Sequence, residues 1–449
     1  MEILDKSQFE KNLNLIAISI PAKETKFYIK EFKEYFLDIP KVKFLYKNPE
    51  NPNVRILVFC ENITDPIKLN GLKEEKKKIL EEKSIKPFEY SVKIGYDSLT
   101  SKQVLEKILP KELELPTSFE TIGHIAHLNL KENLLKYKKI IGEVILDKNP
   151  KIKTVVNKTN MISNQYRVFP MEILAGEENF ETEVKCDSIR FRLNYSKVYW
   201  NSRLQTEHER LTTSLFADFS TKTPKNSPLI ICDMFCGIGP FAVRAAKRGA
   251  LVYANDLNPD SFFYLKLNAK INQVESNIIP FNLDAREFVK KYVSDWQTNH
   301  NCDPTQFCSH FIMNLPKLSI FFLDVFRGIL SFLPSTPVYH QVQMPMIHCY
   351  CFSKEVDKEK DAIQRINQIL DFQIRNFSCR NIRSVSTKKD MLCISFRLPE
   401  EVAIADNRKR KVDVDQNDGN VVEQEKIIEN LIEKENEENE NLEEIKRKK

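Results

Sequence analysis

The pattern of apolar and polar positions changes along the chain and divides it into regions. In the first 110 residues, short apolar stretches alternate with lysine-rich pieces of helical period. The predicted elements here are helices over residues 25–36 and 72–82 and strands over 54–60 and 88–94. No residue in these elements is of a catalytic type. We therefore predict a small N-terminal α/β domain over residues 1–110.

Residues 111–220 mix helical and alternating patterns and predict an α+β region. Its predicted elements are a helix over 134–147, strands over 152–158, 182–184 and 190–194, and a helix that begins around Arg203. His124 and His127 lie at the start of a strand, where positions three apart point to opposite faces. We interpret them as structural histidines and not as a metal pair.

From residue 221 to residue 400, apolar strands alternate with helices, which is typical of an α/β fold with a parallel sheet. The predicted strands are 229–233, 251–256, 278–284, 310–316, 338–352, 372–377 and 391–396, and the predicted helices are 241–248, 318–333 and 361–370. Residues 294–307 are predicted to form an inserted loop. The last part, 401–449, is dominated by charged residues and asparagine and is predicted to be a disordered tail.

Charge and cysteine content narrow the class of protein. The formal net charge of the chain is +5. The tail has 10 basic and 15 acidic residues and therefore a net charge of −5, so the first 400 residues have a net charge of +10. This modest basic excess fits a polyanionic partner. Ten cysteines without a Cys-x-x-Cys pair indicate reduced core residues and no zinc site. We expect no metal and no membrane span, because no uncharged stretch reaches about 18 residues.

The strand over 229–233 leads into a turn that resembles a nucleotide-binding loop. Gly237 and Gly239 can take backbone angles that other residues avoid, so the main chain can approach a ligand closely. Pro240 suits the start of the next helix. A Gly-x-Gly sequence also occurs in ordinary turns, and Ala242 would complete the dinucleotide pattern, so these glycines do not decide the cofactor.

Acidic residues follow three successive strands, at positions 233, 256 and 284. Asp256 lies 17 residues after Gly239, near the spacing expected of a carboxylate that binds a ribose diol. Each acid might instead cap the helix after its strand, an alternative that three acids in register make weaker. The fourth strand ends in Asn314-Leu-Pro316.

The segment before this region concentrates charged and aromatic side chains. Arg203, Glu207 and Arg210 are spaced to share one face of a helix. By composition alone, this pattern favours a surface salt-bridge ladder of small energetic value. The neighbouring Tyr199 and Trp200 favour a platform for a nucleic-acid base instead.

Four motifs together resemble one family. They are Tyr-Arg-Val-Phe-Pro-Met-Glu-Ile-Leu-Ala-Gly (166–176), Lys-Val-Tyr-Trp-Asn-Ser-Arg-Leu-Gln-Thr-Glu-His-Glu-Arg (197–210), Asp-Met-Phe-Cys-Gly-Ile-Gly-Pro-Phe (233–241) and Met-Asn-Leu-Pro (313–316). Their order and spacing resemble the eukaryotic and archaeal tRNA (guanine(37)-N1)-methyltransferase family, which uses S-adenosylmethionine. Lys317 and Leu318 depart from the small residues usual there, which leaves the shape of the base pocket open.

The resemblance implies the fold and the domains. Residues 221–400 would form a Rossmann-like class I methyltransferase domain with a seven-stranded sheet whose last pair is antiparallel. Residues 111–220 would be a mixed α+β substrate and active-site domain, and residues 1–110 would recognise tRNA.

The resemblance also implies a cofactor site. Asp233 and the loop over 237–239 would lie by the methionine part of S-adenosylmethionine, Asp256 by the ribose and Asp284 by the adenine. The full set of expected cofactor-binding residues is Asp233, Phe235, Gly237, Gly239, Asp256, Leu257, Asp284, Ala285, Asn314 and His208.

The reaction needs a base, because N1 of guanine carries a proton at neutral pH. We assign that role to Glu207. The resemblance places Arg167 near O6, where a permanent charge stabilises the developing anion. Arg203 would orient Glu207 or contact a phosphate, Tyr199 would pack on the flipped-out base, and Asn314 would fix the base edge.

Two other functions stay open at this point. One is transfer of the aminocarboxypropyl arm of the same cofactor in wybutosine synthesis, against which Glu207 and Asn314-Leu-Pro316 argue. The other is a catalytically silent tRNA-binding protein, against which the acids at positions 233, 256 and 284 argue. We expect a monomer that acts on tRNA with guanosine at position 37 in the cytoplasm, with nucleus and mitochondrial matrix as further locations.

Overall fold

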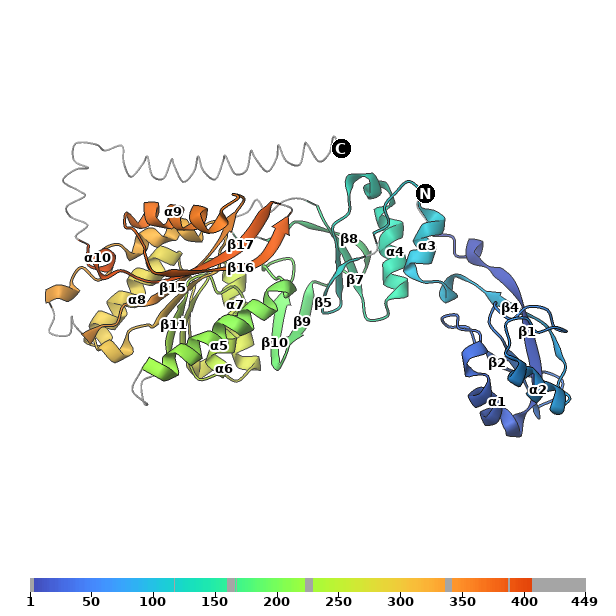
Figure 1. The fold of residues 1–449 in the computed structure, drawn as a ribbon. Coiled ribbons are helices and arrows are strands. Elements are labelled where there is room, and N and C mark those ends of the chain that lie inside the picture. The colour runs from blue at the N-terminus through green and yellow to red at the C-terminus, as the bar shows by residue number, and fades with distance from the viewer. Residues whose placement is uncertain are drawn as a thin grey trace. The chain divides into compact units, whose positions relative to one another are not determined.

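The computed structural model describes residues 4–116, 118–159, 166, 168–222, 229–335, 341–386 and 388–405 (Figure 1). Its contacts divide the chain into two compact units, one of Met1–Met161 with Phe169–Phe180 and one of Ile162–Val168 with Glu181–Lys449. Within the described ranges, no helix is long and apolar enough to cross a membrane. The disordered tail predicted over 401–449 begins too early, because residues 401–403 belong to the helix Glu400–Ala403, in which Val402 and Ala403 are buried. From residue 406 on, the predicted tail lies outside the described residues.

The first unit begins with an antiparallel sheet of order β2-β3-β1-β4. The elements are β1 (Lys11–Pro21), α1 (Thr25–Glu31), β2 (Leu45–Lys47), β3 (Val54–Val58), α2 (Glu74–Glu82) and β4 (Pro87–Ile94). Tyr28 of α1 and Leu80 of α2 share a hydrophobic core with Ile18 and Leu57 of the sheet. The predicted helix over 25–36 is shorter than expected, because it ends at Glu31 and continues as a 3₁₀ turn.

A second sheet in the same unit has the order β5-β6-β7-β8. Its elements are α3 (Ser101–Ile108), β5 (Glu120–Ile122), β6 (Ile125–Leu128), α4 (Lys138–Lys148), β7 (Thr154–Lys158) and β8 (Met171–Gly176). One core joins Phe9 and Tyr96 to Leu105, Ile141 and Val155, so the expected boundary at residue 110 falls within a shared core. The division into four parts stays a prediction.

The two histidines of this region lie apart from any described cluster of metal-binding side chains. His124 follows β5, and its Nε2 lies 3.2 Å from the carbonyl oxygen of Asn179. His127 lies in β6, where burial lowers the pKa of its imidazole. Over the described ranges, no group of three potential metal ligands occurs.

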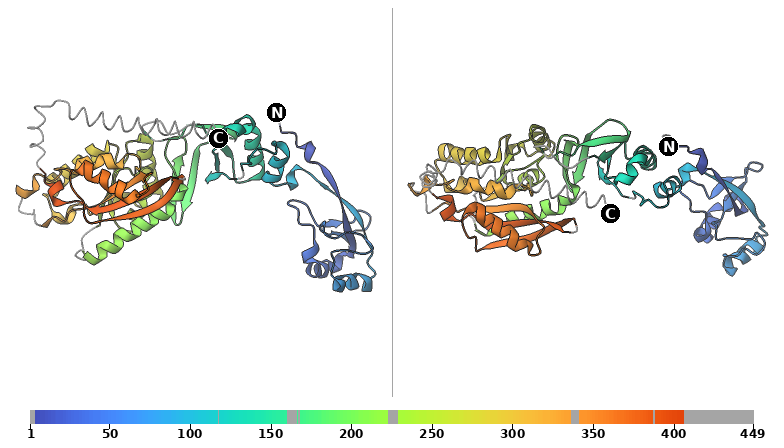
Figure 2. Two further views of the ribbon diagram at one scale, coloured as in Figure 1. Left: turned by 45° about the horizontal axis from the view of Figure 1, so that its top comes forward. Right: turned by 90° about the horizontal axis from the view of Figure 1, so that it is seen from above.

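The second unit is built on a seven-stranded sheet of order β13-β12-β11-β14-β15-β17-β16 (Figure 1). The strands are β11 (Ile230–Asp233), β12 (Leu251–Asn255), β13 (Ile278–Phe281), β14 (His310–Met313), β15 (Met346–Ser353), β16 (Phe377–Ser386) and β17 (Lys389–Arg397). The first five are parallel, and β17 is antiparallel to both of its neighbours. This confirms the expected seven-stranded sheet with an antiparallel final pair. Figure 2 shows the sheet from two further sides.

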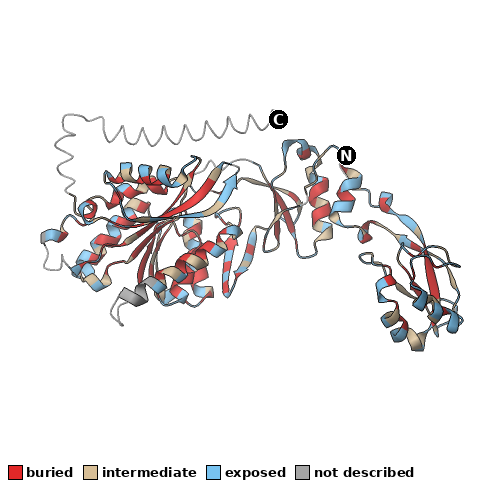
Figure 3. Ribbon diagram, in the orientation of Figure 1, coloured by how far each residue is buried: buried red, intermediate tan, exposed pale blue. Residues whose placement is uncertain are grey.

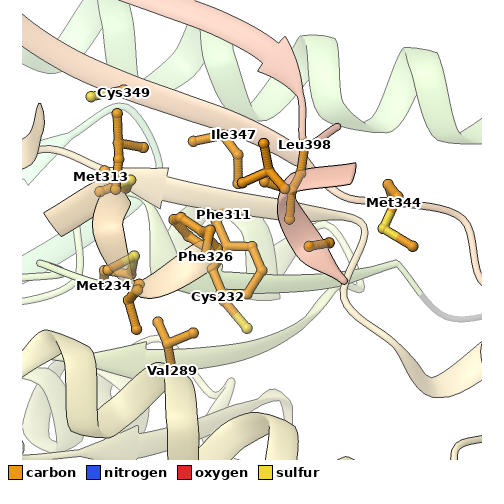
Figure 4. Packing of buried hydrophobic residues seen from close by; sticks show 14 of the residues in the cluster. Cys232, Met234, Val289, Phe311, Met313, Phe326, Met344, Ile347, Cys349 and Leu398 are labelled. Atoms are coloured by element: carbon orange, nitrogen blue, oxygen red, sulfur yellow. The ribbon is translucent and has the colours of Figure 1, made fainter. Parts of the chain in front are cut away.

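Helices cover both faces of this sheet (Figure 1). On one face lie α8 (Ala285–Asn299), the 3₁₀ helix η9 (Ser319–Phe326) and α9 (Lys358–Leu370), and on the other lie α5 (Gln205–Lys222), α6 (Ala242–Lys247) and α7 (Pro259–Ile271). Figure 4 shows Phe311, Met313 and Ile347 of the sheet packed with Val289 and Phe326 of the first group. Buried residues accordingly follow the central strands in Figure 3.

A two-stranded hairpin of β9 (Glu181–Cys186) and β10 (Ile189–Asn194) joins this unit through α7. The side-chain amide of Asn268 accepts from the backbone N–H of Arg192 at 2.7 Å and donates to its carbonyl at 3.1 Å. Asn272 makes the same pair of bonds with Arg190, at 3.1 and 2.7 Å. Two side chains thus take the place of a neighbouring strand.

Several predicted elements in this unit differ from the structure. The strand predicted over 338–352 begins only at Met346. The amphipathic helix expected over 318–333 is only a 3₁₀ helix that ends at Phe326. After it, Gly328 has a positive φ of 65°, and its N–H donates to the carbonyl of Val402 in α10 (Glu400–Ala403). Backbone groups that would continue the helix are therefore used elsewhere.

Two further differences concern boundaries. The loop predicted over 294–307 is helical up to Asn299, because Trp296 is buried and its indole N–H donates to the carbonyl of Asp303. The strand predicted over 372–377 begins only at Phe377. Before it, the side-chain oxygen of Asn367 accepts from the N–H of Ile374.

Candidate functional site

The two glycines after β11 have different structural roles. Both have a positive φ, 54° at Gly237 and 96° at Gly239. A Cβ added at Gly239 would lie 2.8 Å from Leu265 Cδ1 and 2.9 Å from Val243 Cγ2, whereas one added at Gly237 would meet no atom within 4 Å. Gly239 is therefore required for packing, and Gly237 keeps the space above the turn open.

The acids that follow the first three strands differ in their partners. Asp256 accepts from the backbone N–H of Gly237 at 2.8 Å and of Asn258 at 2.9 Å. Burial raises the pKa of Asp256 to about 6, against the lowering effect of these two hydrogen bonds. Asp284 accepts from the N–H of Arg286 and caps α8. The helix-cap alternative thus holds for Asp284, whereas Asn258 and not Asp256 caps α7.

Asp233 is the most unusual of the three. It is fully buried, and neither carboxyl oxygen has a hydrogen-bond partner among the described residues. Burial is the main cause that raises the pKa of Asp233 to about 8, and the charge of Asp256 adds to it. The nearby backbone N–H of Phe235 lowers this pKa without completing a hydrogen bond. Such a group indicates a ligand that supplies donors or positive charge.

A buried amide that the sequence did not single out holds the strand ends together. Asn255 donates to the carbonyl of Met234 at 3.2 Å and to that of Leu283 at 3.0 Å, and it accepts from the N–H of Leu283. Its side chain therefore connects the loops after β11 and β13 to β12. A polar residue at the end of an apolar strand, directly before Asp256, was the signal in the sequence.

Glu207 lies in the first turn of α5, and only 6% of the residue is exposed. Its carboxylate accepts from Arg210 Nε at 2.7 Å and Nη2 at 2.6 Å and from the hydroxyl of Tyr350 at 2.7 Å. The hydrogen bonds to Glu207 are the main cause that raises the pKa of Arg210. A surface salt-bridge ladder is therefore the wrong interpretation for this pair, which is buried and bidentate.

Strand register places Tyr350, whose hydroxyl binds this carboxylate, beside Asn314. The parallel pairing of β14 with β15 ends at Met313 and Cys349, so Asn314 and Tyr350 are the next pair. The N–H of Phe352 donates to the carbonyl of Pro316, which continues the same register. Asn314 Oδ1 is buried and has no partner among the described residues. The hydroxyl that binds Glu207 thus belongs to the residue beside Asn314.

Other predicted residues lie as follows. Arg203 is exposed in a 3₁₀ turn before α5, and in the described ranges it makes no ion pair with Glu207, so its expected contact with that carboxylate is wrong. Arg210 takes that place because it lies on the inner face of the helix. Arg167 lies outside the described residues.

The two aromatic residues before α5 point in different directions. Tyr199 is 40% exposed, and its hydroxyl accepts from Asn201 at 3.3 Å. Trp200 is 8% exposed, with its ring 5.5 Å from that of Phe191, so it belongs to the core and does not form the expected platform.

His208 follows Glu207 and packs against Phe241, the residue that follows Pro240 after the glycine turn. It is buried, and its ring centroid lies 4.6 Å from that of Phe241, whose ring is 6.0 Å from Tyr350. Burial, helped by the charge of Arg244, lowers the pKa of His208 to about 3. The imidazole is therefore neutral at physiological pH and contributes an aromatic surface.

The far side of the turn is lined by aromatic rings. Phe235 lies 5.1 Å from Phe322 of η9, and the guanidinium of Arg286 lies 4.4 Å from the latter ring. Arg286 is fixed by Asp324, which it binds at 3.0 Å. Leu257 is 39% exposed and Ala285 is buried at the start of α8.

These groups fit one kind of ligand. Asp233 and Asn314 offer buried acceptors, Asp256 fixes the loop of Gly237, and apolar side chains line the far side. A nucleoside that carries a cationic amino-acid arm matches this combination of unpartnered acceptors and apolar walls.

The strand order, the reversed strand β17 and the polar residues after successive strands define a class I methyltransferase. Residues 182–373 match the family described as "TRM5/TYW2 methyltransferase domain", and residues 101–179 match "TYW2 N-terminal domain". The chain belongs to the tRNA (guanine(37)-N1)-methyltransferase family.

Similar proteins support this membership. The tRNA (guanine(37)-N(1))-methyltransferase of Phytophthora infestans is 39% identical over 415 residues, covering 91% of this chain and 95% of the relative. That of Batrachochytrium dendrobatidis is 36% identical and covers 97% of each chain. The crystal structure of Trm5b from Pyrococcus abyssi is 25% identical, with a TM-score of 0.54, and covers 85% of this chain and 99% of its own.

Proposed function

We propose that this chain transfers the methyl group of S-adenosylmethionine to N1 of guanosine 37 in tRNA. The observation that carries the proposal is the buried carboxylate of Glu207, held next to the strand end that bears Asn314. The relatives reported above are named for this reaction, which favours it over aminocarboxypropyl transfer.

The cofactor would be held by the residues that follow the parallel strands. S-adenosylmethionine, when bound, supplies an electrophilic methyl group on a sulfonium sulfur. Asp233 would bind its cationic amino-acid arm, which keeps the buried carboxyl ionised. Asp256 would accept from the ribose, because a carboxylate that already binds two N–H groups retains free lone pairs.

The remaining cofactor contacts surround the nucleoside. Phe235, Leu257 and Ala285 would line the adenine side, with Asp284 at its edge. His208 would provide a neutral ring below the turn. Gly237 would let the main chain approach the ligand, since a side chain there would enter open space.

Glu207 would take the proton from N1 of guanine. Arg210 and Tyr350 donate three hydrogen bonds to this carboxylate, which fix its direction. They are positioning residues, because they act through Glu207. Asn314 would contact the base edge through its buried amide oxygen. Fixed orientation of base and acceptor is a large part of such catalysis.

Three further roles follow from the family resemblance. Arg167 would stabilise charge on O6. Tyr199, which is exposed, would pack on the flipped-out base. Arg203 is exposed and free of Glu207, so contact with a phosphate is the role left to it.

The decisive experiment is incubation with labelled S-adenosylmethionine and unmodified tRNA that carries guanosine at position 37. Methyl on N1 supports the proposal, whereas transfer of the aminocarboxypropyl arm or of nothing contradicts it. Glu207→Gln is expected to lower kcat by roughly 10²–10⁴-fold while the Kd for S-adenosylmethionine is unchanged.

Glu209→Gln is the control on the same helix, because Glu209 is partly exposed and pairs with Arg244 and Arg248 instead of with the partners of Glu207. Arg244 is buried and keeps Asp187 as a partner in this variant, so the melting temperature of the control is measured as well. The control should retain full turnover. If Glu207→Gln also retains it, Glu207 is not the base. The monomeric state, the lack of membrane attachment and the cellular location stay predictions.

A further inference from the structure

Arg380 connects the solvent to the buried carboxylate of Glu207. It lies on β16, the edge strand of the seven-stranded sheet. Its side chain is 59% exposed, yet its Nε lies 3.9 Å from Glu207 Oε2, whose side chain is 7% exposed. This distance is too long for a hydrogen bond. The side chain of Arg380 donates no hydrogen bond to any described residue, so its N–H groups are available to a ligand.

Strand register puts a second arginine on the same face. Arg380 pairs with Cys393, which pairs with Tyr350. After a bulge in β16, Arg383 pairs with Met391, opposite Phe352. Residues two apart on a strand point to one face, so both arginines lie on the face of Tyr350, roughly 7 Å apart along the strand. Unlike Arg380, Arg383 forms no ion pair with the described residues.

The position of Arg380 next to Glu207, with Arg383 on the same face, determines which part of a bound nucleotide they can contact. A guanine whose N1 reaches Glu207 must leave its ribose and phosphates on the exposed side of the site. Arg380 extends from that carboxylate to solvent, since its Nε lies 3.9 Å from Glu207 Oε2 and its side chain is 59% exposed. A guanidinium is a rigid fork of donors that matches phosphate oxygens and remains charged when partly desolvated.

We propose that Arg380 and Arg383 bind the phosphates next to the target guanosine and so position its base against Glu207. This inference rests on the proposed function and adds a substrate-binding surface on the edge strand β16. Charged residues also protect edge strands from pairing with other chains, and that explanation alone would give the arginines no effect on tRNA binding.

The test compares Arg380→Ala, Arg383→Ala and Arg375→Ala over a series of salt concentrations. Arg375 is the matched control, because it is an exposed arginine that lies before the first residue of β16, Phe377. For each variant, kcat and the KM for tRNA are measured, together with the Kd for S-adenosylmethionine.

The expected result is a rise of roughly tenfold in the KM for tRNA in each of the first two variants. The slope of log KM against log salt concentration should fall by about 0.7–1 for each arginine removed. The control and the Kd for S-adenosylmethionine should not change. Arg380→Lys should recover part of the loss, because it restores the charge without the fork.

Two results would overturn the inference. A fall in kcat with an unchanged salt slope would show that Arg380 acts on Glu207 alone. Unchanged KM in both variants would leave the arginines as edge charges only. If the wild type transfers no methyl group, the proposed function fails, but filter binding of tRNA to the same variants still decides whether the arginines bind phosphate.

Discussion

Tyr350 and Arg210 hold the carboxylate of Glu207 from two elements far apart in the sequence. Arg210 comes from the next turn of the same helix, while Tyr350 comes from β15, 143 residues away. Both the pairing and the burial of Tyr350 raise the pKa of its hydroxyl, with burial the larger cause. The hydroxyl therefore remains a donor throughout the working pH range.

Tyr350→Phe removes one donor from Glu207 and leaves the ring packed against Phe241. We expect kcat to fall by roughly tenfold while the Kd for S-adenosylmethionine is unchanged, since Glu207 loses one of the three hydrogen bonds that fix its orientation. A role in packing alone would lower the melting temperature and leave kcat unchanged.

Asp233 predicts a pH dependence of stability in the ligand-free protein. Its folded-state pKa of about 8 exceeds the ordinary value of 3.8, so the group favours folding below pH 4, and this contribution is lost as the pH rises to about 8. Asp233→Asn should flatten the fall of melting temperature over this window.

The same variant should weaken the binding of S-adenosylmethionine, measured by calorimetry at pH 7.5, by at least roughly tenfold. A variant that binds as tightly as the wild type would contradict the assignment of Asp233 to the cationic arm.

The functional role of a single residue could be predicted only where its side chain is of a reactive or binding type and its position in a local motif is also informative. The acids at positions 233, 256 and 284 stand out in the sequence, but their different partners depend on loops that meet only in the fold. Tyr350 and Arg380 carry no local signal, because their relation to Glu207 arises from strands distant in the chain.

In the turn between β11 and α6, one glycine is needed for packing and the other for ligand binding. Gly239→Ala should lower the melting temperature by several degrees, because the new Cβ would contact Leu265 and Val243 at a strained φ. Gly237→Ala should cost less stability but should weaken the binding of S-adenosylmethionine more. Thermal unfolding and calorimetric titration of both variants test this, and equal effects on both quantities would contradict it.

Elements with a long, regular apolar period were predicted well, and those defined by contacts at their ends were not. The strands β11, β12 and β14 begin where their apolar stretches begin. The helix expected over 318–333 failed because positive φ at Gly328 and hydrogen bonds to α10 interrupt it, and neither follows from periodicity.

For the whole molecule, the two units have hydrophobic cores of their own. S-adenosylmethionine would contact residues of the second unit only. Calorimetry of the full chain should therefore show the ligand raising the melting temperature of one transition, with roughly 2.7 kcal/mol of stabilisation at a hundredfold excess over Kd. An equal shift of every transition would show that the units unfold together.

At this scale the sequence predicted the class of fold, because successive strands with polar ends have few alternative arrangements. It did not predict that residues 1–110 share a core with the segment that follows, since Phe9, Tyr96 and Leu105 are ordinary apolar residues whose partners lie beyond the expected boundary.

The amide of Asn255 also limits how this pocket can be re-engineered. It stands on one strand and satisfies backbone groups of the loops after two others. A synthetic cofactor analogue could require a loop taken from a distant relative. The loops after β11 and β13 would then have to be exchanged together, because both are hydrogen-bonded to Asn255.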